Sequence, residues 1–435
     1  MPEPVIIKES LAEHMSTSLT ETLANASRQA QERNYADLLI VDADSHHHET
    51  SYAPWREISQ YIEDDTIRLR VDAAMKRSPG SSGMGSTVRG SIGDRSMGGR
   101  IQRQGLRPTD VNEGESRGVA AVKRAMECMG IDYSVLFPTP LLNVGVLPEV
   151  DVQVNTMWAY ARWLTEQVIP AEPSIKTLVC LPFNDPDASL RMVKTFGDRP
   201  GVLGFVVGST FHHPVHSKRF LPIYAEIEAL GKPMAFHSAY NWHDRLTEQF
   251  NKFLSAHGIG RTLYNIVHLT NWTINGIPER FPDLKAVWIE SGVTFLPFLM
   301  QRLDAEYMMR TSEAPLLKKL PSEYMQEYFY TAQPLENTVH QDALAMTFDM
   351  IHAETQLMYA SDYPHWDFDV PSVIYDLPFL TEQARRNILG ENALNLFGLE
   401  RPAKLNGQRR GSQLRSSDLA EDGVEAPPVD ISFAD

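Results

Sequence analysis

Residues 38–49 read LLIVDADSHHHE, an apolar run that ends abruptly in carboxylates and imidazoles. Such a run is typical of a buried parallel strand, and its polar end corresponds to the strand's carboxyl end. Barrel enzymes hold their catalytic groups at the carboxyl ends of their strands. We therefore interpret this stretch as the first strand of a barrel that ends in a metal site.

The spacing of the polar residues favours a metal site at this strand end. Residues two apart in an extended strand point the same way, so Asp42, Asp44 and His46 would share one face. A carboxylate and an imidazole on one face can bind the same cation, and Glu49 could reach back to it from beyond the strand. His47 should point away. The alternative is a solvated loop whose histidines have no function.

Length and composition limit the classes of protein that fit. The 435 residues suit one large barrel with insertions, and Cys128 and Cys180 provide neither a disulfide framework nor a zinc knuckle. The N-terminus lacks a signal-peptide pattern and no apolar run is long enough for a membrane span, so we expect a cytoplasmic protein that does not bind membranes. The net charge of −16 argues against nucleic acid as a partner.

From residue 118 onward, helical segments alternate with short apolar runs. With residues 38–49, the predicted strands are residues 132–139, 175–183, 201–209, 232–240, 284–292, 327–333 and 355–364. Alternation of strands and helices with this number of strands predicts an α/β fold, a (β/α)8 TIM barrel with a parallel sheet inside and helices outside. A doubly wound open sheet is the alternative.

The barrel is predicted to occupy residues 35–400, with an extension or insertion in three places. Residues 1–34 are a polar, helix-prone N-terminal extension, and residues 401–435 are a flexible C-terminal tail. Residues 56–117 form a long insertion after the first strand, rich in Gly, Ser and Arg and without hydrophobic period, which we interpret as an irregular lid or loop. The two terminal extensions would suit a homo- or hetero-oligomer.

Polar residues also stand at the ends of three later predicted strands. His237 ends the fifth strand, Glu290 ends the sixth, and Asp362 ends the eighth, with His365 three residues later. The carboxyl ends of barrel strands lie on one rim, so these side chains should meet those of the first strand. We predict a shared metal centre there. We expect His268, which lies in a helical pattern, to pack in the core instead.

Three motifs resemble the amidohydrolase superfamily, specifically the amidohydrolase-related branch that includes metal-dependent decarboxylases. They are DADSHHHE near the start, GIPERFPDLKAVWIESGVTFLPFLMQRLD at residues 276–304, and the closing YASDYPHWD. The resemblance implies that Asp44 and His46 are the first-strand metal ligands, that His237 is the fifth-strand histidine, and that Asp362 is the eighth-strand aspartate, which binds metal or acts as a general base.

Two departures from this family bear on the chemistry. Glu290 stands where many members have a histidine, and GVLGFVVGS contains no lysine that could be carboxylated to bridge two metals. A carboxylate-rich set suits Mn or Fe, as one ion or two, although Zn also accepts mixed ligands. The predicted metal ligands are Asp44, His46, Glu49, His237, Glu290 and Asp362, and the predicted catalytic residues are Asp362, Glu290 and His365.

These residues predict a metal-dependent enzyme that acts on a small organic acid or amide. A bound cation would activate water for hydrolysis or assist decarboxylation, with Asp362 moving a proton. The alternative is a dinuclear Fe or Mn/Fe monooxygenase component that hydroxylates a small organic acid with a separate reductase as partner. A third possibility is a barrel without catalytic activity that serves as a scaffold subunit.

Overall fold

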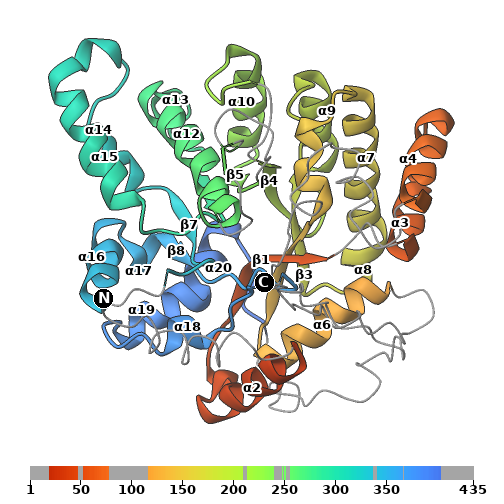
Figure 1. Cartoon of the computed structure of the whole chain (residues 1–435), viewed down its shortest axis with the longest axis horizontal. Helices are drawn as coiled ribbons and strands as arrows, with labels where there is room; N and C mark the ends of the chain where they lie inside the picture. The colour runs from red at the N-terminus through yellow and green to blue at the C-terminus, as the bar shows by residue number, and fades with distance from the viewer. Residues whose placement is uncertain are drawn as a thin grey trace, which may run out of the picture.

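The structure, a computed structural model, describes residues 19–47, 52–77, 116–208, 213–239, 247, 249–250, 255–336, 340–365 and 367–402. Eight parallel strands pair in sequence order to form the barrel (Figure 1). They are β1 (Val41–His47), β2 (Tyr133–Pro138), β3 (Ile175–Cys180), β4 (Val202–Gly208), β5 (Met234–His237), β6 (Ala286–Ile289), β7 (Phe329–Thr331) and β8 (Leu357–Met358). This order confirms the predicted (β/α)8 barrel and excludes a doubly wound sheet, whose strand order reverses part-way.

Backbone hydrogen bonds bring the first and last strands together. Ala43 N donates to Tyr359 O at 3.0 Å, and beyond the end of β8 Asp362 N donates to Asp44 O at 2.8 Å. The closure therefore sets two predicted site residues, Asp44 and Asp362, side by side through their main chains.

Helices lie between the strands along the chain and surround the barrel (Figure 1). From residue 117 onward the longer ones are α6 (Arg117–Met129), α7 (Val150–Trp163), α9 (Pro186–Phe196), α10 (Leu221–Ala229), α12 (Arg261–Ile274), α14 (Leu296–Arg310), α16 (Gln341–Met350) and α20 (Asn392–Phe397). No helix in the described ranges combines the length and the apolar character that crossing a membrane requires.

Short helical elements complete the connections. The α-helical ones are α8 (Ile169–Ala171), α13 (Ile277–Arg280), α15 (Pro321–Met325), α17 (Ala353–Gln356), α18 (Ser372–Tyr375) and α19 (Glu382–Arg386). The 3-10 turns are η1 (Tyr35–Asp37), η3 (Pro140–Val146), η5 (Lys218–Phe220) and η7 (Thr311–Glu313), and the π-helical turns are η4 (Leu164–Val168), η6 (Ala256–Gly260) and η8 (Asn387–Glu391).

The core explains why apolar runs form these strands. Every residue of β1 is buried, and Phe236 of β5 stacks on Trp288 of β6 with ring centroids 4.7 Å apart. Burying an apolar side chain of this size stabilises the folded state by roughly 2–3 kcal/mol. The barrel thus provides a rigid support for the polar residues at its rim.

Part of the predicted N-terminal extension packs on the barrel. Helix α2 (Leu19–Glu32) buries Leu23, Ala26 and Ala30 and lies against α6. Its small side chains allow close approach to the chain around Gly130, which ends α6 in the left-handed conformation at φ 75°.

The predicted insertion is helical at its start, which differs from the irregular structure expected for residues 56–117. Helices α3 (Tyr52–Ser59) and α4 (Asp65–Arg77) occupy this part, and α4 buries Ile67 and Val71. These residues are four apart and lie on one helix face. Two apolar residues in a polar stretch are too few to reveal a helical period in the sequence. Residues 78–115 and 403–435 lie outside the described residues, as does Glu49.

Candidate metal centre

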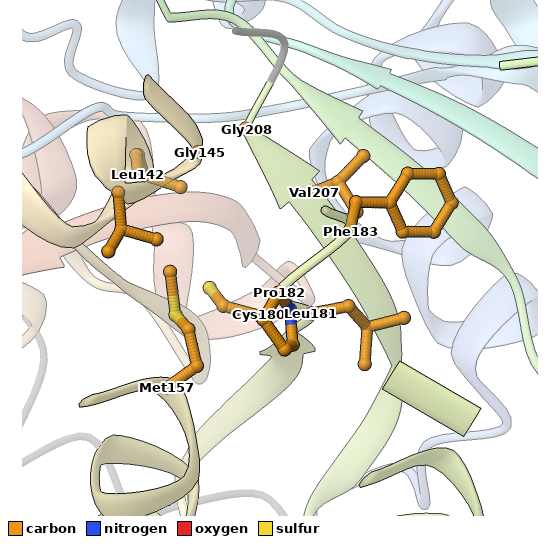
Figure 2. Close-up of a pocket in the computed structure, with 10 residues that line it drawn as sticks. Leu142, Gly145, Met157, Cys180, Leu181, Pro182, Phe183, Val207 and Gly208 are labelled. Atoms are coloured by element: carbon orange, nitrogen blue, oxygen red, sulfur yellow. The ribbon is translucent and has the colours of Figure 1, made fainter. Parts of the chain in front are cut away.

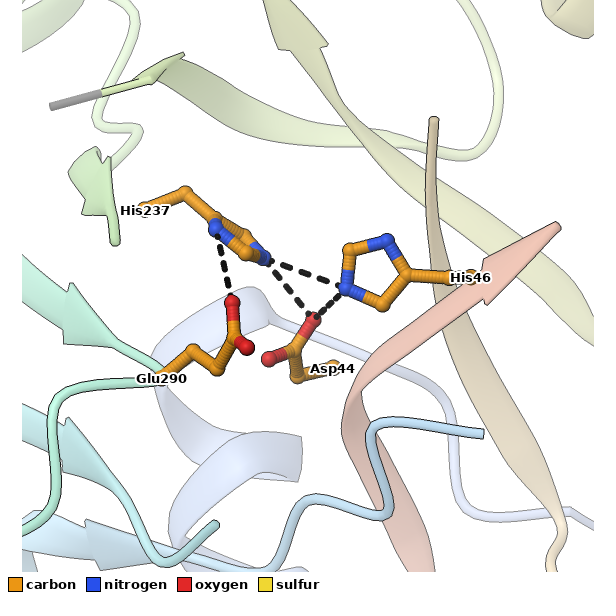
Figure 3. Close-up of side chains that lie close together, drawn as sticks. All are labelled: Asp44, His46, His237 and Glu290. Atoms are coloured by element: carbon orange, nitrogen blue, oxygen red, sulfur yellow. Dashed lines mark hydrogen bonds and ion pairs between the residues drawn. The ribbon is translucent and has the colours of Figure 1, made fainter. Parts of the chain in front are cut away.

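Four buried side chains from the ends of β1, β5 and β8 converge on one point. His46 Nε2 lies 3.1 Å from Asp44 Oδ1, 3.2 Å from Asp362 Oδ1 and 3.2 Å from His237 Nε2. All four side chains are fully buried. Figure 3 shows the two imidazoles of this set turned toward each other beside the Asp44 carboxylate. The structure therefore brings together residues that are far apart in the sequence.

Backbone carbonyls orient both imidazoles. His46 Nδ1 is 3.0 Å from Pro138 O, and His237 Nδ1 is 2.8 Å from Ser238 O, so each Nδ1 donates its proton to a carbonyl. This leaves Nε2 of each ring as the atom that can bind a metal. A hydrogen bond on the far nitrogen is the arrangement found around most metal-binding histidines.

The electrostatics of the cluster favour a cation. Burial opposes ionisation of Asp44 and Asp362, but the neighbouring histidines outweigh it and hold the pKa of Asp44 below, and that of Asp362 well below, the usual range. Burial also opposes protonation of His46, but the two carboxylates raise its pKa to about 10. The site therefore holds two carboxylates that stay charged and attract positive charge.

The atoms of the cluster fit a divalent metal. Asp44 Oδ2 and Asp362 Oδ2 are buried and have no hydrogen-bond partner among the described residues. Leaving a charged oxygen buried and unpaired costs free energy, and coordination of a cation would remove that cost. Two imidazole nitrogens with carboxylate oxygens are a ligand set that Mn, Fe or Zn accepts.

Two acidic residues of the site have strained backbones. Glu290 has φ 55° and Asp362 has φ 59°, in the left-handed region that costs side-chain-bearing residues about 1–3 kcal/mol. Asp362 is held there by the hydrogen bond to Asp44 O, and Glu290 N donates to Thr331 Oγ1 at 3.0 Å. Strain of this kind is concentrated at functional sites.

Glu290 approaches the cluster from the other edge of His237. Its Oε2 lies 3.5 Å from His237 Nδ1 and accepts a hydrogen bond from Ser238 Oγ at 3.2 Å, and its Oε1 pairs with Arg261 (Figure 3 shows the contact with His237). Its ligand atom is within 4.8 Å of those of Asp44, His46 and His237, so its predicted role as a ligand stays a prediction.

His365 also lies at the site. Its Nδ1 is 2.6 Å from Asp362 Oδ1, its ring centroid is 4.4 Å from that of His46, and its Nε2 is 3.2 Å from Thr139 Oγ1. Burial lowers the pKa of His365. A neutral imidazole bonded to a buried carboxylate can pass a proton to or from a substrate at the barrel mouth.

Asp42 does not join the cluster, although simple strand alternation placed it on the same face. The pairing of β1 with β2 shifts register between Asp42 and Ser45, which breaks the alternation. The Asp42 carboxylate instead accepts hydrogen bonds from Ser361 N at 2.8 Å and Ser361 Oγ at 2.5 Å. Burial raises the pKa of Asp42 to about 7.

Two other histidines lie as the sequence predicts. His47 points away from the cluster, with Nε2 2.7 Å from the Tyr160 hydroxyl and its ring stacked on Trp163. His268 is buried in α12 and its ring stacks on Phe236. Neither belongs to a described group of side chains that could hold a metal.

Sequence reasoning missed two basic residues at the rim. Arg261, the first residue of α12, pairs with Glu290, and His257 in η6 lies with Nε2 3.7 Å from Asp367 Oδ2. The two residues are four positions apart, with His257 on the π-helical turn and Arg261 directly after it, and such turns are frequent at functional sites. A histidine and an arginine at helical spacing after the fifth strand were the available signal.

A small apolar pocket lies at the ends of β3 and β4 (Figure 2). Gly208 at the end of β4 pairs with His237 in the sheet, but none of the residues that line the pocket belongs to the metal cluster. A Cβ atom at Gly208 would meet Leu142 O at 2.0 Å, so glycine is required for η3 to pack there. The lining residues are Leu142, Val144, Gly145, Met157, Cys180, Leu181, Pro182, Phe183, Val207 and Gly208.

Comparison with known families agrees with this geometry. The family described as amidohydrolase matches residues 43–399. The chain belongs to the amidohydrolase family. The match includes β1 from Ala43 onward and all the other strands, so it covers every strand end that contributes to the metal cluster of this amidohydrolase. No curated protein sequence matches this amidohydrolase significantly.

Solved structures similar to this amidohydrolase include decarboxylases of aromatic acids. One is 5-carboxyvanillate decarboxylase from Sphingomonas paucimobilis, with a TM-score of 0.58 and 22% identity, over 84% of this chain and 100% of that one. Another is dihydroxybenzoic acid decarboxylase from Polaromonas sp. JS666 with bound manganese and 2-nitroresorcinol, with a TM-score of 0.57 and 17% identity, over 85% and 99%. A third is 5-carboxyvanillate decarboxylase from Novosphingobium aromaticivorans with manganese and 4-hydroxy-3-methoxy-5-nitrobenzoic acid, with a TM-score of 0.57 and 17% identity, over 84% and 97%.

Proposed function

We propose that this amidohydrolase is a manganese-dependent decarboxylase of a small aromatic acid. The observation that carries the proposal is the convergence of two imidazoles and two ionised carboxylates. His237 Nε2 and one carboxylate oxygen each of Asp44 and Asp362 lie within 3.2 Å of His46 Nε2. A site of this composition, buried at the carboxyl ends of barrel strands, suits metal catalysis on a small substrate.

Two observations favour decarboxylation over hydrolysis. The sixth strand ends in Glu290, which is tied to Arg261, where hydrolytic relatives have an imidazole that polarises the substrate or shuttles a proton. The similar solved structures named above are decarboxylases, two of them with manganese.

The residues of the chain supply positioning and a proton. A divalent cation held by Asp44, His46, His237 and Asp362 would act as a Lewis acid toward substrate oxygens. The bond between the ring carbon and the carboxylate breaks, carbon dioxide leaves, and the electron pair stays on the ring carbon. That carbon then takes a proton from the imidazolium form of His365, which Asp362 Oδ1 holds through Nδ1 and which takes up its proton from water.

A panel of hydroxybenzoic acids tests the proposal. Protein loaded with Mn²⁺ is incubated with each acid, and carbon dioxide and the decarboxylated phenol are measured. We expect equimolar amounts of both from at least one acid, and no product from D362N. Release of an amine or alcohol from a parallel panel of amides and esters, without carbon dioxide from any acid, would instead support hydrolysis.

A second candidate is a dinuclear monooxygenase component. The observation that favours it is a pair of overlapping ligand groups, Asp44–His46–His237–Glu290 and His46–Asp362–His365, which share His46. Elemental analysis of protein expressed with both manganese and iron available distinguishes the candidates. We expect about one ion per chain. Two ions that include iron, together with dioxygen consumption, would favour the monooxygenase and its separate reductase.

A further inference from the structure

Arg261 differs from the other partners of the cluster acids. Within the described part of the chain, Asp44 and Asp362 form ion pairs with histidines. Glu290 pairs with His237 and also with an arginine, Arg261. The Arg261 side chain is only 15% exposed. A permanently charged guanidinium is thus held, nearly buried, at the mouth of the barrel.

Hydrogen bonds fix the first turn of α12 to the barrel rim, and with it the position of Arg261. Thr262 Oγ1 donates to Ser291 O at 2.9 Å, and the buried Asn265 side chain donates to Phe236 O at 3.2 Å and Ile289 O at 3.3 Å. The backbone of this turn is therefore attached to the ends of β5 and β6. Arg261 pairs with Glu290, whose Oε2 lies 3.5 Å from His237 Nδ1, so the guanidinium charge lies beside the cluster.

We propose that Arg261 binds the carboxylate of an acidic substrate, with Glu290 holding the guanidinium in place. The planar fork of N–H donors in an arginine side chain matches the geometry of a carboxylate. The inference rests on the proposed function in one respect, namely that the substrate is an acid.

Charge balance in the cluster supports this role. The three carboxylates of Asp44, Glu290 and Asp362 carry −3, a divalent cation supplies +2, and Arg261 supplies +1, so the loaded cluster is neutral when its histidines are neutral. Without Arg261 the net charge would be −1. A negatively charged mouth in a buried site would repel an anionic substrate, whereas a neutral mouth with an oriented guanidinium can accept it.

Binding of two matched probes tests the role of Arg261. The probes are 4-hydroxy-3-methoxy-5-nitrobenzoate and 2-methoxy-6-nitrophenol, which is the same ring without the carboxylate. Their dissociation constants are measured by calorimetry on Mn²⁺-loaded wild type, R261Q, R261K and R302Q. R302Q is the control, because Arg302 is exposed on α14.

We expect the wild type and R302Q to bind the acid more tightly than the phenol. In R261Q, affinity for the acid should fall about 10- to 100-fold, the loss expected for a hydrogen-bonded charge pair, with less than about 3-fold change for the phenol. R261K keeps a charge to pair with Glu290 but not the planar fork, so it should fold even where R261Q does not, and it should lose part of the preference for the acid.

Three results would overturn the proposal. They are a wild type without preference for the acid, an acid affinity unchanged in R261Q (or in R261K where R261Q does not fold), and an equal loss for both probes. Manganese content is measured in each variant, so that a lost metal is not mistaken for a lost subsite. If the binding pattern holds but no hydroxybenzoic acid releases carbon dioxide, the proposed reaction fails and the carboxylate subsite stands.

Discussion

The Nε2 atoms of His46 and His237 lie 3.2 Å apart, although 191 positions separate the two residues in the chain. Two imidazole nitrogens approach this closely when a proton lies between them or when both bind one cation. The other nitrogen of each ring already donates to a backbone carbonyl, so the Nε2 atoms are the ones that a proton or a metal must share. Competition between the proton and the metal for this position leads to the first two predictions.

Replacing His46 should abolish tight metal binding. H46N removes the nitrogen that lies within 3.2 Å of three other candidate ligand atoms, so we expect Mn²⁺ affinity to fall by roughly 100-fold or more. The matched control is H268N, which removes a buried imidazole that stacks on Phe236 and belongs to no described group that could hold a metal. Calorimetric titration with Mn²⁺ measures both. An equal loss in the two variants would mean that the effect comes from the barrel core and not from coordination.

Binding of Mn²⁺ should release a proton at neutral pH. In the metal-free protein the carboxylates of Asp44 and Asp362 raise the pKa of His46 to about 10, so this imidazole is protonated at pH 7 and must lose its proton to bind a metal. Affinity should therefore rise about tenfold per pH unit between pH 7 and 9. Titration in buffers of different ionisation enthalpy gives the number of protons released. A value near zero at pH 7 would show that His46 is neutral before the metal binds.

The same interaction affects the stability of the metal-free protein. The unfolded value for this histidine is 6.5, so the stabilisation from its raised pKa is fully present below pH 6.5 and is lost as pH rises toward 10. Wild type should lose stability over this range relative to H46N, measured by chemical denaturation in the presence of a chelator. Equal pH dependence of the two proteins would argue against a charged His46.

The sequence was sufficient to predict the barrel and most of the cluster. In β1, β5, β6 and β8 an apolar run ends directly in a polar residue, and the same boundary marks both the strand and the barrel rim. A parallel barrel then needs no further information to bring His237 and Asp362 next to Asp44.

Two features could not be predicted because they depend on local irregularities. A register shift in β1 turns Asp42 toward Ser361, and strand alternation does not reveal such a shift. Arg261 follows a π-helical turn, whose extra residue rotates the helix face that meets the rim, so no regular period identifies it as a site residue.

Replacing Asp42 should remove a pH-dependent loss of stability. Burial raises the pKa of Asp42 from 3.8 to about 7, so the folded protein holds this proton more tightly than the unfolded chain does. The resulting stabilisation is present below about pH 4 and is lost as pH rises through 7. Asparagine keeps an acceptor for Ser361 N without the charge. We expect the stability of D42N relative to wild type to increase between pH 5 and 8 in urea denaturation, whereas D283N, at an exposed aspartate, should show no such trend.

A pair of glycines allows the packing next to Glu290 to be measured separately from backbone strain. Gly292 (φ 69°) and Gly231 (φ 64°) both have left-handed backbones, so alanine at either position should cost about 1–2 kcal/mol. A Cβ atom at Gly292 would also meet Glu336 Oε1 at 2.2 Å, whereas one at Gly231 would meet nothing within 4 Å. Glu336 accepts hydrogen bonds from Val293 N at 3.1 Å and from Thr294 Oγ1 at 2.8 Å, so it cannot move without losing them.

We therefore expect G292A to destabilise the protein by about 1–3 kcal/mol more than G231A does, because the lost hydrogen bonds add to the backbone cost. Urea denaturation of both variants measures the difference. The chain from Glu290 to Gly292 follows directly from β6, so a shift of Glu336 should also displace Glu290 and weaken Mn²⁺ binding in G292A alone. Equal destabilisation of the two variants would show that Glu336 moves freely and that the segment after β6 is not held by it.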